Sequence, residues 1–370
     1  MRNPFKPTAG ARPPLLVGRG DALDGFREGL EDGPGSPGLL TIFTGPRGIG
    51  KTVMLTAAED AAGEQGWVVV SETATSGLMV RLAEATRRHL EELGDGPPSR
   101  RVTAVVAAGF GLTTQLPPER QIAWRELATE LLTLLARRGT GLLITVDEIH
   151  AVDRRELSEL AAVVQHLIRD SLPIGLLLAG IPKAVSDLLN EDVSTFLRRA
   201  DRIDLRDVLI ADVRESLART FEDTGVRISS AQLDRAAEAT RGYPFLIQLV
   251  GYHVWRRAVE GSVTDEALTA GVEAARRRLG ATVLQAALTD LSQVDRTFLL
   301  KMSEDDGPSQ LSMIAQRLGE NTKYAGVYRR RLLDAGVVVD AGRGLLDFAV
   351  PHLRQYLREH AASMYEPNLP

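Results

Sequence analysis

The chain has 370 residues, of which 44% are hydrophobic, and a formal net charge of −5 at pH 7. This length suggests two or three domains, and the mild acidic balance excludes a global attraction to nucleic acids or anionic membranes. The sequence contains no cysteine, which excludes a disulfide framework and a cysteine-based zinc site. Without a signal-peptide core or an apolar run of roughly 18 residues, we expect a cytoplasmic protein with no membrane partner.

The first 207 residues fall into two segments. Residues 1–14 hold four prolines and are expected to form a flexible N-terminal tail. Residues 15–207 alternate apolar strands with helices, which indicates a P-loop parallel sheet with flanking helices, an α/β fold. The predicted strands are 39–43, 67–73, 141–148, 174–180 and 201–205, and 101–116 is interpreted as a hairpin. The predicted helices between them are 51–63, 77–93, 119–138, 153–170 and 182–190.

The rest of the chain is mainly helical in pattern. Residues 208–282 are predicted to form an all-α lid subdomain with helices at 210–223, 229–240, 243–260 and 264–278. Residues 283–370 then give helices at 292–303, 309–319 and 322–335, two short strands around a glycine-rich turn within 336–350, and a final helix. This order is typical of a C-terminal winged-helix domain.

The stretch from Gly45 to Thr52 matches the phosphate-loop pattern G-x-x-x-x-G-K-[ST] between a predicted strand and a predicted helix. In this pattern backbone N–H groups cradle the phosphates, Lys51 reaches the β- and γ-phosphates, and the Thr52 hydroxyl binds Mg²⁺. We therefore expect ATP and Mg²⁺ as ligands. The predicted nucleotide-binding residues of the loop are Gly45, Pro46, Arg47, Gly48, Ile49, Gly50, Lys51, Thr52 and Val53.

A second motif, at the end of a predicted buried strand, supplies two carboxylates. Asp147 is the expected second Mg²⁺ residue beside Thr52, and Glu148 is the expected general base for the attacking water. We accordingly predict Glu148 and Lys51 as catalytic residues. The alternative is a carboxylate pair that only caps the strand. His150 is interpreted as a surface or polar-network residue.

Three further segments hold candidate site residues. Arg198 and Arg199 precede the last strand and are candidates for an arginine finger that reaches a neighbouring subunit, or else for a solvated helix face. Arg241 is a candidate phosphate contact. Gly242, Tyr243 and Pro244 follow it and suit the start of a helix, with proline in the first helical position.

The order of these motifs resembles that of AAA+ ATPases of the initiator-like and archaeal-type branch, which grades into the STAND ATPases. The resemblance covers residues 15–280, and a C-terminal winged helix also suits that branch. It implies that Val17, Gly18 and Arg19 lie beside the adenine, although Gly20 replaces the usual acidic residue. It further implies that the turn with Tyr243 and Pro244 docks the lid over the nucleotide.

The same resemblance implies a polar residue that senses the γ-phosphate at the end of the strand 174–180. Ala179 and Gly180 stand there instead, and Lys183 just beyond is a weaker candidate for that role. This departure favours slow hydrolysis.

The segment 309–335 is interpreted as a helix-turn-helix with a basic second helix. Between residues 317 and 331 there are five basic residues and one acidic residue. Such a face suits duplex DNA, whereas other winged helices bind protein or pack on their own ATPase domain. The candidate DNA contacts are Lys323, Tyr324, Arg329, Arg330 and Arg343.

Together these features predict Mg²⁺-dependent ATP binding and slow hydrolysis of ATP to ADP and phosphate, used as a conformational switch with output through the winged helix. The alternatives are a nucleotide-controlled DNA-binding protein of initiator or loader type, and an ATP-binding interaction scaffold with little turnover. Duplex DNA, a partner protein or a second copy of the chain are the expected partners.

Overall fold

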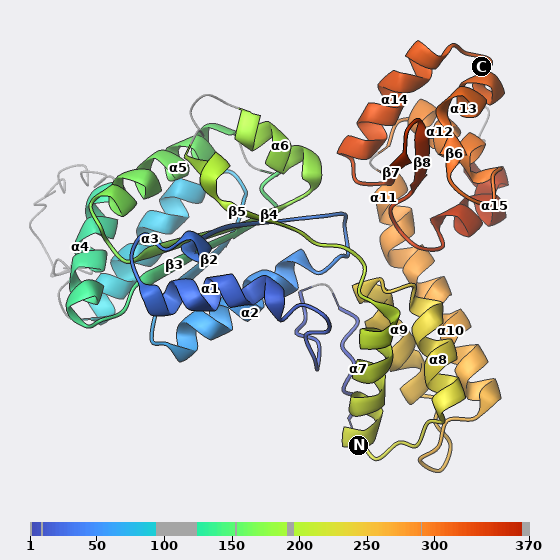
Figure 1. Cartoon of the computed structure of the whole chain (residues 1–370), viewed down its shortest axis with the longest axis horizontal. Helices are drawn as coiled ribbons and strands as arrows, with labels where there is room; N and C mark the ends of the chain where they lie inside the picture. Colours follow the sequence, from blue (N-terminus) through green and yellow to red (C-terminus); the bar gives the residue numbers. More distant parts are fainter. Residues whose placement is uncertain are drawn as a thin grey trace, which may run out of the picture.

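The chain folds into three lobes (Figure 1). The computed structural model describes residues 2–8, 10–93, 124–151, 154–190, 196–289 and 291–364. The predicted hairpin at 101–116 and the first residues of the predicted helix 119–138 lie outside these ranges. None of the described helices is both long enough and apolar enough to cross a membrane.

The first lobe is built on a five-stranded sheet in which every pairing is parallel. The strands lie in the order β2-β3-β4-β1-β5, with β3 and β4 in the centre and buried along almost their whole length. This confirms the predicted parallel sheet with flanking helices. The strand bounds are β1 Leu40–Thr44, β2 Val68–Thr73, β3 Leu142–Asp147, β4 Ile174–Gly180 and β5 Asp201–Asp204.

Helices cover both faces of the sheet because successive strand side chains point to opposite sides. Phe43 of β1 faces the same core as α1 and α2, whereas its neighbour Ile42 faces the core formed by α3, α4, α5 and α6. Both faces are therefore apolar, which explains the continuous hydrophobic runs of the strands. The helix bounds are α1 Asp21–Asp32, α2 Lys51–Glu64, α3 Leu78–Glu92, α4 Trp124–Arg137, α5 Arg154–Arg169 and α6 Pro182–Asn190.

The second lobe is a bundle of α7 Ile210–Asp223, α8 Ser230–Thr240, α9 Pro244–Trp255 and α10 Asp265–Leu279. Proline begins α9 as expected, since its missing N–H is not needed in the first turn. The structure differs from expectation after α10. The helical path continues as a π-helix, η4 (Gly280–Leu284), and then as α11 (Gln285–Thr289), so the predicted boundary at residue 282 falls inside a continuous helical segment.

The third lobe begins with α12 (Gln293–Ser303) and ends with α15 (Leu353–Met364). Three antiparallel strands pair in the order β6-β8-β7. The two expected strands are present, and the short β6 takes the first two residues of a predicted helix. The assignment of the third lobe as a winged helix stays a prediction. The remaining bounds are β6 Ser309–Gln310, α13 Leu311–Leu318, α14 Thr322–Asp334, β7 Val338–Gly342 and β8 Leu345–Phe348.

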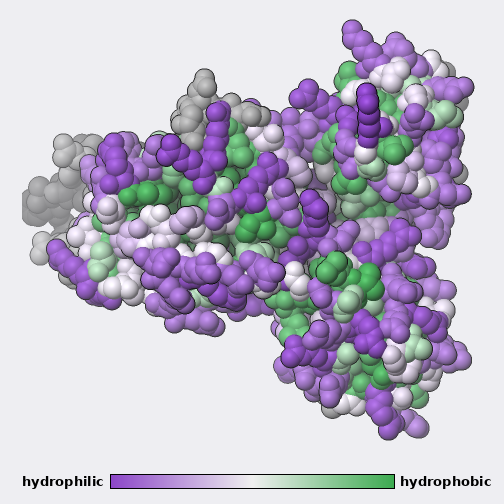
Figure 2. Space-filling model, viewed as in Figure 1, coloured by the Kyte–Doolittle hydropathy of each residue, from purple (hydrophilic) through white to green (hydrophobic). Residues whose placement is uncertain are grey.

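The first residues do not behave as the flexible tail that we expected. The Phe5 side chain is only 3% exposed and packs on the second lobe, with its ring centroid 5.6 Å from that of Phe221. Gly251 of α9 makes room for it, since a Cβ there would lie 2.3 Å from the Phe5 ring. Burial of one aromatic side chain thus fixes a proline-rich segment. Hydrophilic side chains cover most of the face shown in Figure 2, with separate hydrophobic patches on the lobes.

Candidate functional site

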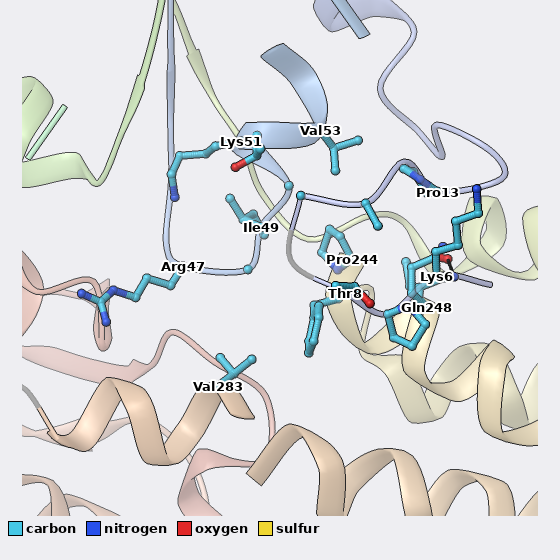
Figure 3. Close-up of a pocket in the computed structure, with 18 of the residues that line it drawn as sticks. Lys6, Thr8, Pro13, Arg47, Ile49, Lys51, Val53, Pro244, Gln248 and Val283 are labelled. Carbon is cyan, nitrogen blue, oxygen red and sulfur yellow. Dashed lines mark hydrogen bonds between the residues drawn. The ribbon is translucent and has the colours of Figure 1, made fainter. Parts of the chain in front are cut away.

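A cavity of about 710 Å³ lies beside the phosphate loop, a size typical of small-molecule sites. Four segments line it: residues between Lys6 and Arg19, the loop with the start of α2, the start of α9, and the helical path from α10 to α11. Glu148 and Val208 complete the lining. Figure 3 shows the loop residues on one side and N-terminal residues on the other. The predicted residues among the lining are Val17, Arg19, Arg47, Gly48, Ile49, Gly50, Lys51, Thr52, Val53, Glu148 and Pro244.

The phosphate loop connects β1 to the N-terminus of α2, where unpaired backbone N–H groups form a natural anion site. The Lys51 ammonium lies within this loop and donates hydrogen bonds to the carbonyl oxygens of Gly45 (3.0 Å) and Pro46 (2.8 Å). Burial lowers the pKa of Lys51, and the nearby carboxylates of Glu148 and Asp147 oppose this shift. Lys51 is therefore positioned to exchange two carbonyl partners for phosphate oxygens.

The two predicted Mg²⁺ residues meet at the carboxyl edge of the sheet. Thr52 Oγ1 donates a hydrogen bond to Asp147 Oδ2 over 2.5 Å. The other oxygen of Asp147 accepts from the backbone N–H of Glu148 at 2.7 Å. A hydroxyl and a carboxylate are hard oxygen ligands that fit Mg²⁺, which also uses phosphates and water. Within the described residues no cluster of three or more His, Cys, Asp or Glu side chains could hold a metal.

Glu148 occupies a strained backbone position beside the cavity. Its φ of 56° lies in the left-handed region, which is uncommon for residues other than glycine. Its side chain lines the cavity, and Oε2 lies 3.2 Å from Nε2 of His150. This geometry turns the carboxylate out of the strand toward the loop. His150 takes part in a polar pair with the predicted base.

Tyr243 supports the phosphate loop from behind and does not line the cavity. Its side chain is fully buried, and its hydroxyl donates to the carbonyl oxygen of Arg47 at 2.8 Å. A Cβ on Gly48 would lie 1.9 Å from the same hydroxyl, so this close approach requires glycine. Burial raises the pKa of Tyr243, which keeps the hydroxyl protonated as a donor. The predicted nucleotide contact of Tyr243 is therefore wrong in position, whereas its neighbour Pro244 lines the cavity.

Arg19 connects the N-terminal segment to the loop. Its guanidinium donates to the carbonyl oxygen of Ile49 at 3.4 Å and to that of Arg206. Burial lowers the pKa of Arg19, an effect that the charge of Asp207 opposes. Gly18 lies against α7 instead of the cavity, because a Cβ there would be 2.9 Å from a carboxylate oxygen of Asp212.

Residues 15–178 match the AAA ATPase domain family. The chain therefore contains an AAA ATPase domain. Residues 281–357 match a family described as a domain of unknown function, DUF8462, which covers most of the third lobe. Among curated proteins, none matches the chain.

Solved structures share the fold of the AAA ATPase domain and of the lobes that follow. The Walker-type ATPase PABY2304 of Pyrococcus abyssi gives a TM-score of 0.68 at 16% identity, over 94% of this chain and 97% of that chain. The ORC2 protein of Aeropyrum pernix gives 0.63 at 17% identity over 96% and 97%. Cdc6p of Pyrobaculum aerophilum gives 0.52 at 15% identity, over 97% of both chains. At these identities the likeness establishes the fold.

Four predicted cations lie away from the cavity of the AAA ATPase domain. Lys183 does not point toward a γ-phosphate position, because its ammonium lies 3.3 Å from carboxylate oxygens of both Asp187 and Asp334. Arg241 is the C-cap residue of α8, and its charge acts on His352 of the third lobe. Arg198 and Arg199 are exposed in the short helix η3 (Leu197–Arg199), where Arg198 donates to the Leu189 carbonyl. Their action across a subunit interface stays a prediction.

The candidate DNA surface of α14 is less basic than its sequence suggests. Arg329 pairs with Asp340 on the adjacent strand, and Arg331 lies 2.9 Å from Asp295. Arg317 pairs with Asp305, so three of the five basic residues are neutralised within the lobe. The Tyr324 ring packs 4.9 Å from that of Tyr328. Lys323, Arg330 and Arg343 are exposed, so a partner can reach them.

Several lining residues were absent from the sequence predictions. They come from segments far from the motifs and include Lys6, Thr8, Pro13, Gln248, Arg278, Thr282 and Val283. No motif marks them, because their proximity to the loop arises only when the N-terminus and α10 fold against it. The one local signal was Gly280, which interrupts a helical pattern where the π-helix forms.

Proposed function

We propose that the cavity binds ATP with Mg²⁺, and that slow hydrolysis of ATP to ADP and phosphate in the cytoplasm resets a conformational switch. The carrying observation is that one cavity is lined at once by Lys51 and Glu148, by the lid helix α9, and by residues 278–286, which lead into the third lobe. A ligand that fills it contacts the first two lobes and the helical path that leads into the third lobe. The ORC2 structure of similar fold is described as ADPNP and ADP complexes, which supports a nucleotide as that ligand.

Two polar residues of the loop and the two carboxylates after β3 have defined roles in this proposal. Lys51 would bind the β- and γ-phosphates, and Thr52 and Asp147 would hold the metal. Bound Mg²⁺ would neutralise charge that develops on the phosphates. Glu148 would accept a proton from the attacking water, which becomes the hydroxyl of the released phosphate.

Slow turnover is supported by the strand between the loop and the carboxylates. β4 pairs with both β1 and β3, so its carboxyl end lies between the phosphate loop and Asp147. Ala179 at this end is fully buried and has no polar side chain. The nearest sequence candidate, Lys183, is held by Asp187 and Asp334. In this proposal the γ-phosphate of ATP therefore lacks a polar contact from β4 that would stabilise it during hydrolysis.

The third lobe is placed to respond to the bound nucleotide. Thr282 and Val283 of the π-helix line the cavity, and Tyr356 of α15 packs on Gly280 of the same segment. The third lobe also approaches the loop directly, since a Cβ on Gly336 would lie 3.7 Å from Cα of Pro46. These contacts support an output through this lobe, acting as a winged helix.

A second function, nucleotide-controlled binding of duplex DNA, is favoured by the exposed cations of the third lobe. Lys323 and Arg330 lie on α14 and Arg343 lies at the turn between β7 and β8, where a helix and a wing would meet DNA. The competing interpretation is an interaction scaffold that binds a partner protein or a second copy of the chain and barely turns over ATP.

One set of assays on the purified chain tests these proposals. We would measure ATP turnover and ATP affinity for wild type, Lys51→Ala and Glu148→Gln, with and without Mg²⁺ and duplex DNA. We expect Lys51→Ala to abolish ATP binding. Glu148→Gln should still bind ATP, but its turnover should be slower than that of wild type by a factor of about 10² or more. Glu92→Gln, at the exposed end of α3, is the matched control and should behave as wild type.

The outcomes of these assays distinguish between the three proposed functions. Turnover that survives Lys51→Ala would exclude the ATPase site described above. Tight ATP binding without measurable turnover in wild type would favour the scaffold. Absence of DNA binding at low salt, with and without ATP, would exclude the DNA function.

A further inference from the structure

A second cavity, of about 340 Å³, lies between the first and third lobes. One wall comes from the first lobe, with Pro46 of the phosphate loop, the start of α6 and Arg202 of β5. The other wall comes from the third lobe, with the end of α14 and β7. Figure 1 shows α6 on the side of the first lobe that faces α14 and β7, and the ion pair between Lys183 and Asp334 joins the two walls. This cavity shares no described lining residue with the larger one that Lys51 lines.

The strand β7 borders this second cavity with an open edge. β7 is the last strand in the order β6-β8-β7, so only one of its edges pairs with β8. The N–H of Ala349 donates to the carbonyl oxygen of Val337, whereas the next N–H, that of Phe348, donates to a side chain. Hydrogen-bonded and non-hydrogen-bonded pairs alternate along antiparallel strands, so Val338 and Asp340 direct their backbone N–H and C=O groups away from β8. Both residues line the cavity.

The backbone of Val338 lacks a partner on this open edge. Val338 is only 2% exposed, yet its N–H and C=O make no hydrogen bond to the described residues on the side away from β8. Buried backbone groups are nearly always paired, because an unpaired one costs free energy comparable to a lost hydrogen bond. The next residue, Val339, is an apolar side chain that is 41% exposed at the same cavity. Both features indicate a surface that a partner completes.

The opposite wall carries another strand edge, but that edge is protected. β5 is the last strand on its side of the five-stranded sheet, and Arg202 of β5 lines the cavity. Three of the four residues of β5 are charged: Asp201, Arg202 and Asp204. Charged side chains on an edge strand discourage pairing with another chain, whereas the cavity side of β7 begins with two valines. An added strand would therefore pair with β7 and lie against β5.

The charges that line the cavity already have partners within the chain. The charged lining residues belong to the ion pairs Lys183–Asp334, Arg202–Asp204 and Arg329–Asp340. Much of the remaining wall is apolar, with Pro46, Pro182, Leu333, Val338 and Val339. A charged ligand would have to break one of these pairs, so the cavity suits an uncharged chain segment.

We propose that β7 binds an extended, uncharged segment of a partner protein, which adds as a β-strand to the edge formed by Val338 and Asp340. In strand addition, main-chain hydrogen bonds supply the affinity and pockets for alternate side chains supply the specificity. The added segment would also contact Pro46, whose carbonyl oxygen accepts a hydrogen bond from the Lys51 ammonium at 2.8 Å. The partner would thus lie against the outer side of the phosphate loop. This inference goes beyond the proposed nucleotide function and does not depend on it.

Two variants of residue 340 test the strand edge. Asp340→Pro removes the N–H that points away from β8, and proline is tolerated on an edge strand where its nitrogen does not face the neighbouring strand. Asp340→Ala also removes the carboxylate but keeps this N–H, so it is the matched control. Short peptides would be selected from a phage-displayed random library on the wild-type chain and synthesised, and their affinities measured by fluorescence anisotropy. We expect Asp340→Pro to weaken binding about tenfold or more and Asp340→Ala to stay within about threefold of wild type.

A second measurement leaves the protein unchanged. Along an added strand every second residue directs its backbone groups toward β7. Methylation of a peptide nitrogen at such a residue removes the donor, so methyl groups placed one at a time should weaken binding about tenfold at alternate positions. The positions between them should change little. A peptide bound as a helix or a loop would not give this period of two.

The outcomes separate strand addition from other modes of binding. Failure of the library to give a binder, or equal affinity for wild type and Asp340→Pro, would overturn the proposal. Methylation effects without the alternating pattern would overturn it as well. If urea denaturation shows that Asp340→Pro does not fold, the methylation pattern on wild type decides alone. Loss of ATP binding would overturn the proposed nucleotide function and leave the peptide result unaffected.

Discussion

Thr52 and Asp147 share a hydrogen bond of 2.5 Å although they lie 95 positions apart in the chain. The contact exists because β1 and β3 are both parallel to β4 and end at the same edge of the sheet. It brings the hydroxyl at the end of the phosphate loop to the carboxylate that ends β3, and these are the two oxygens that the proposed function assigns to a divalent cation.

Removal of either oxygen should therefore affect the metal more than the nucleotide. We expect Asp147→Asn and Thr52→Val to lower turnover about 10²-fold and to raise the Mg²⁺ concentration needed for half-maximal rate. ATP affinity without Mg²⁺ should change little. Titration of turnover with Mg²⁺ checks this, and an unchanged Mg²⁺ requirement in both variants would argue against this metal position.

Gly48→Ala should damage the loop because its new methyl group meets the Tyr243 hydroxyl at a position of φ 72°. We expect a loss of about 1–3 kcal/mol of unfolding free energy and weaker ATP binding. The double variant Gly48→Ala/Tyr243→Phe should recover part of the ATP affinity, since the colliding oxygen is gone. Urea denaturation and nucleotide titration measure both effects.

Gly319→Ala is the matched control for that variant. Gly319 has φ 71°, but no heavy atom lies within 4 Å of its potential Cβ. It should cost only the backbone strain, about 1 kcal/mol, and leave ATP affinity unchanged. If Gly319→Ala also impaired ATP binding, backbone strain and not the Tyr243 contact would explain Gly48→Ala.

Lys183 and Asp334 connect α6 of the first lobe to α14 of the third. Both side chains are partly exposed, so we expect a double-mutant cycle with Lys183→Ala and Asp334→Ala to give a coupling of only about 0.2–1 kcal/mol. The charge reversal Lys183→Asp should weaken the interface and Lys183→Asp/Asp334→Lys should restore it, measured by small-angle scattering. No coupling and no restoration would mean that this contact does not hold the lobes together.

His352 should make stability depend on pH. Burial first, and then the charges of Arg276 and Arg241, lower its pKa from 6.5 to about 4. The unfolded chain therefore binds the proton more readily, so stability is complete above pH 6.5 and falls as pH drops toward 4. Because the ring is partly exposed, we expect about 1–2 kcal/mol over this range.

Unfolding free energies at pH 7.5, 6 and 5 measure this effect. His352→Asn is a suitable control because asparagine tolerates the observed φ of 64° and does not titrate. The difference between wild type and this variant should shrink with falling pH, and parallel pH profiles would assign the slope to other groups.

The exposed cations should control any affinity for DNA. We expect Arg330→Ala and Arg343→Ala each to weaken binding to duplex DNA uniformly across sequences and to reduce the slope of log affinity against log salt by about 1. Arg329→Ala should instead act on stability, because Arg329 pairs with Asp340. Equal DNA effects for all three variants would contradict the distinction between exposed and paired arginines.

The sequence alone determined the phosphate loop, the Asp147–Glu148 pair and most helices and strands. These features are local, since the loop is a contiguous pattern and the strands are apolar runs bounded by breakers. Parallel pairing of β1, β3 and β4 then followed from helices placed between buried strands. The alternation of elements therefore sufficed to place Thr52 near Asp147.

Only the tertiary structure decided which other side chains join the site. Tyr243 donates a hydrogen bond to the backbone of the loop, and Lys183 forms an ion pair with Asp334. Polar and charged groups pair with the partners that the tertiary structure brings close to them. The N-terminal segment that contains Phe5 was predicted to be a flexible tail. The glycine that leaves room for the Phe5 ring, Gly251, lies far along the chain, so no local pattern indicated this contact. Contacts between distant segments produce no periodic pattern in the sequence. Because such contacts form the walls of this cavity, only the tertiary structure identifies its lining residues.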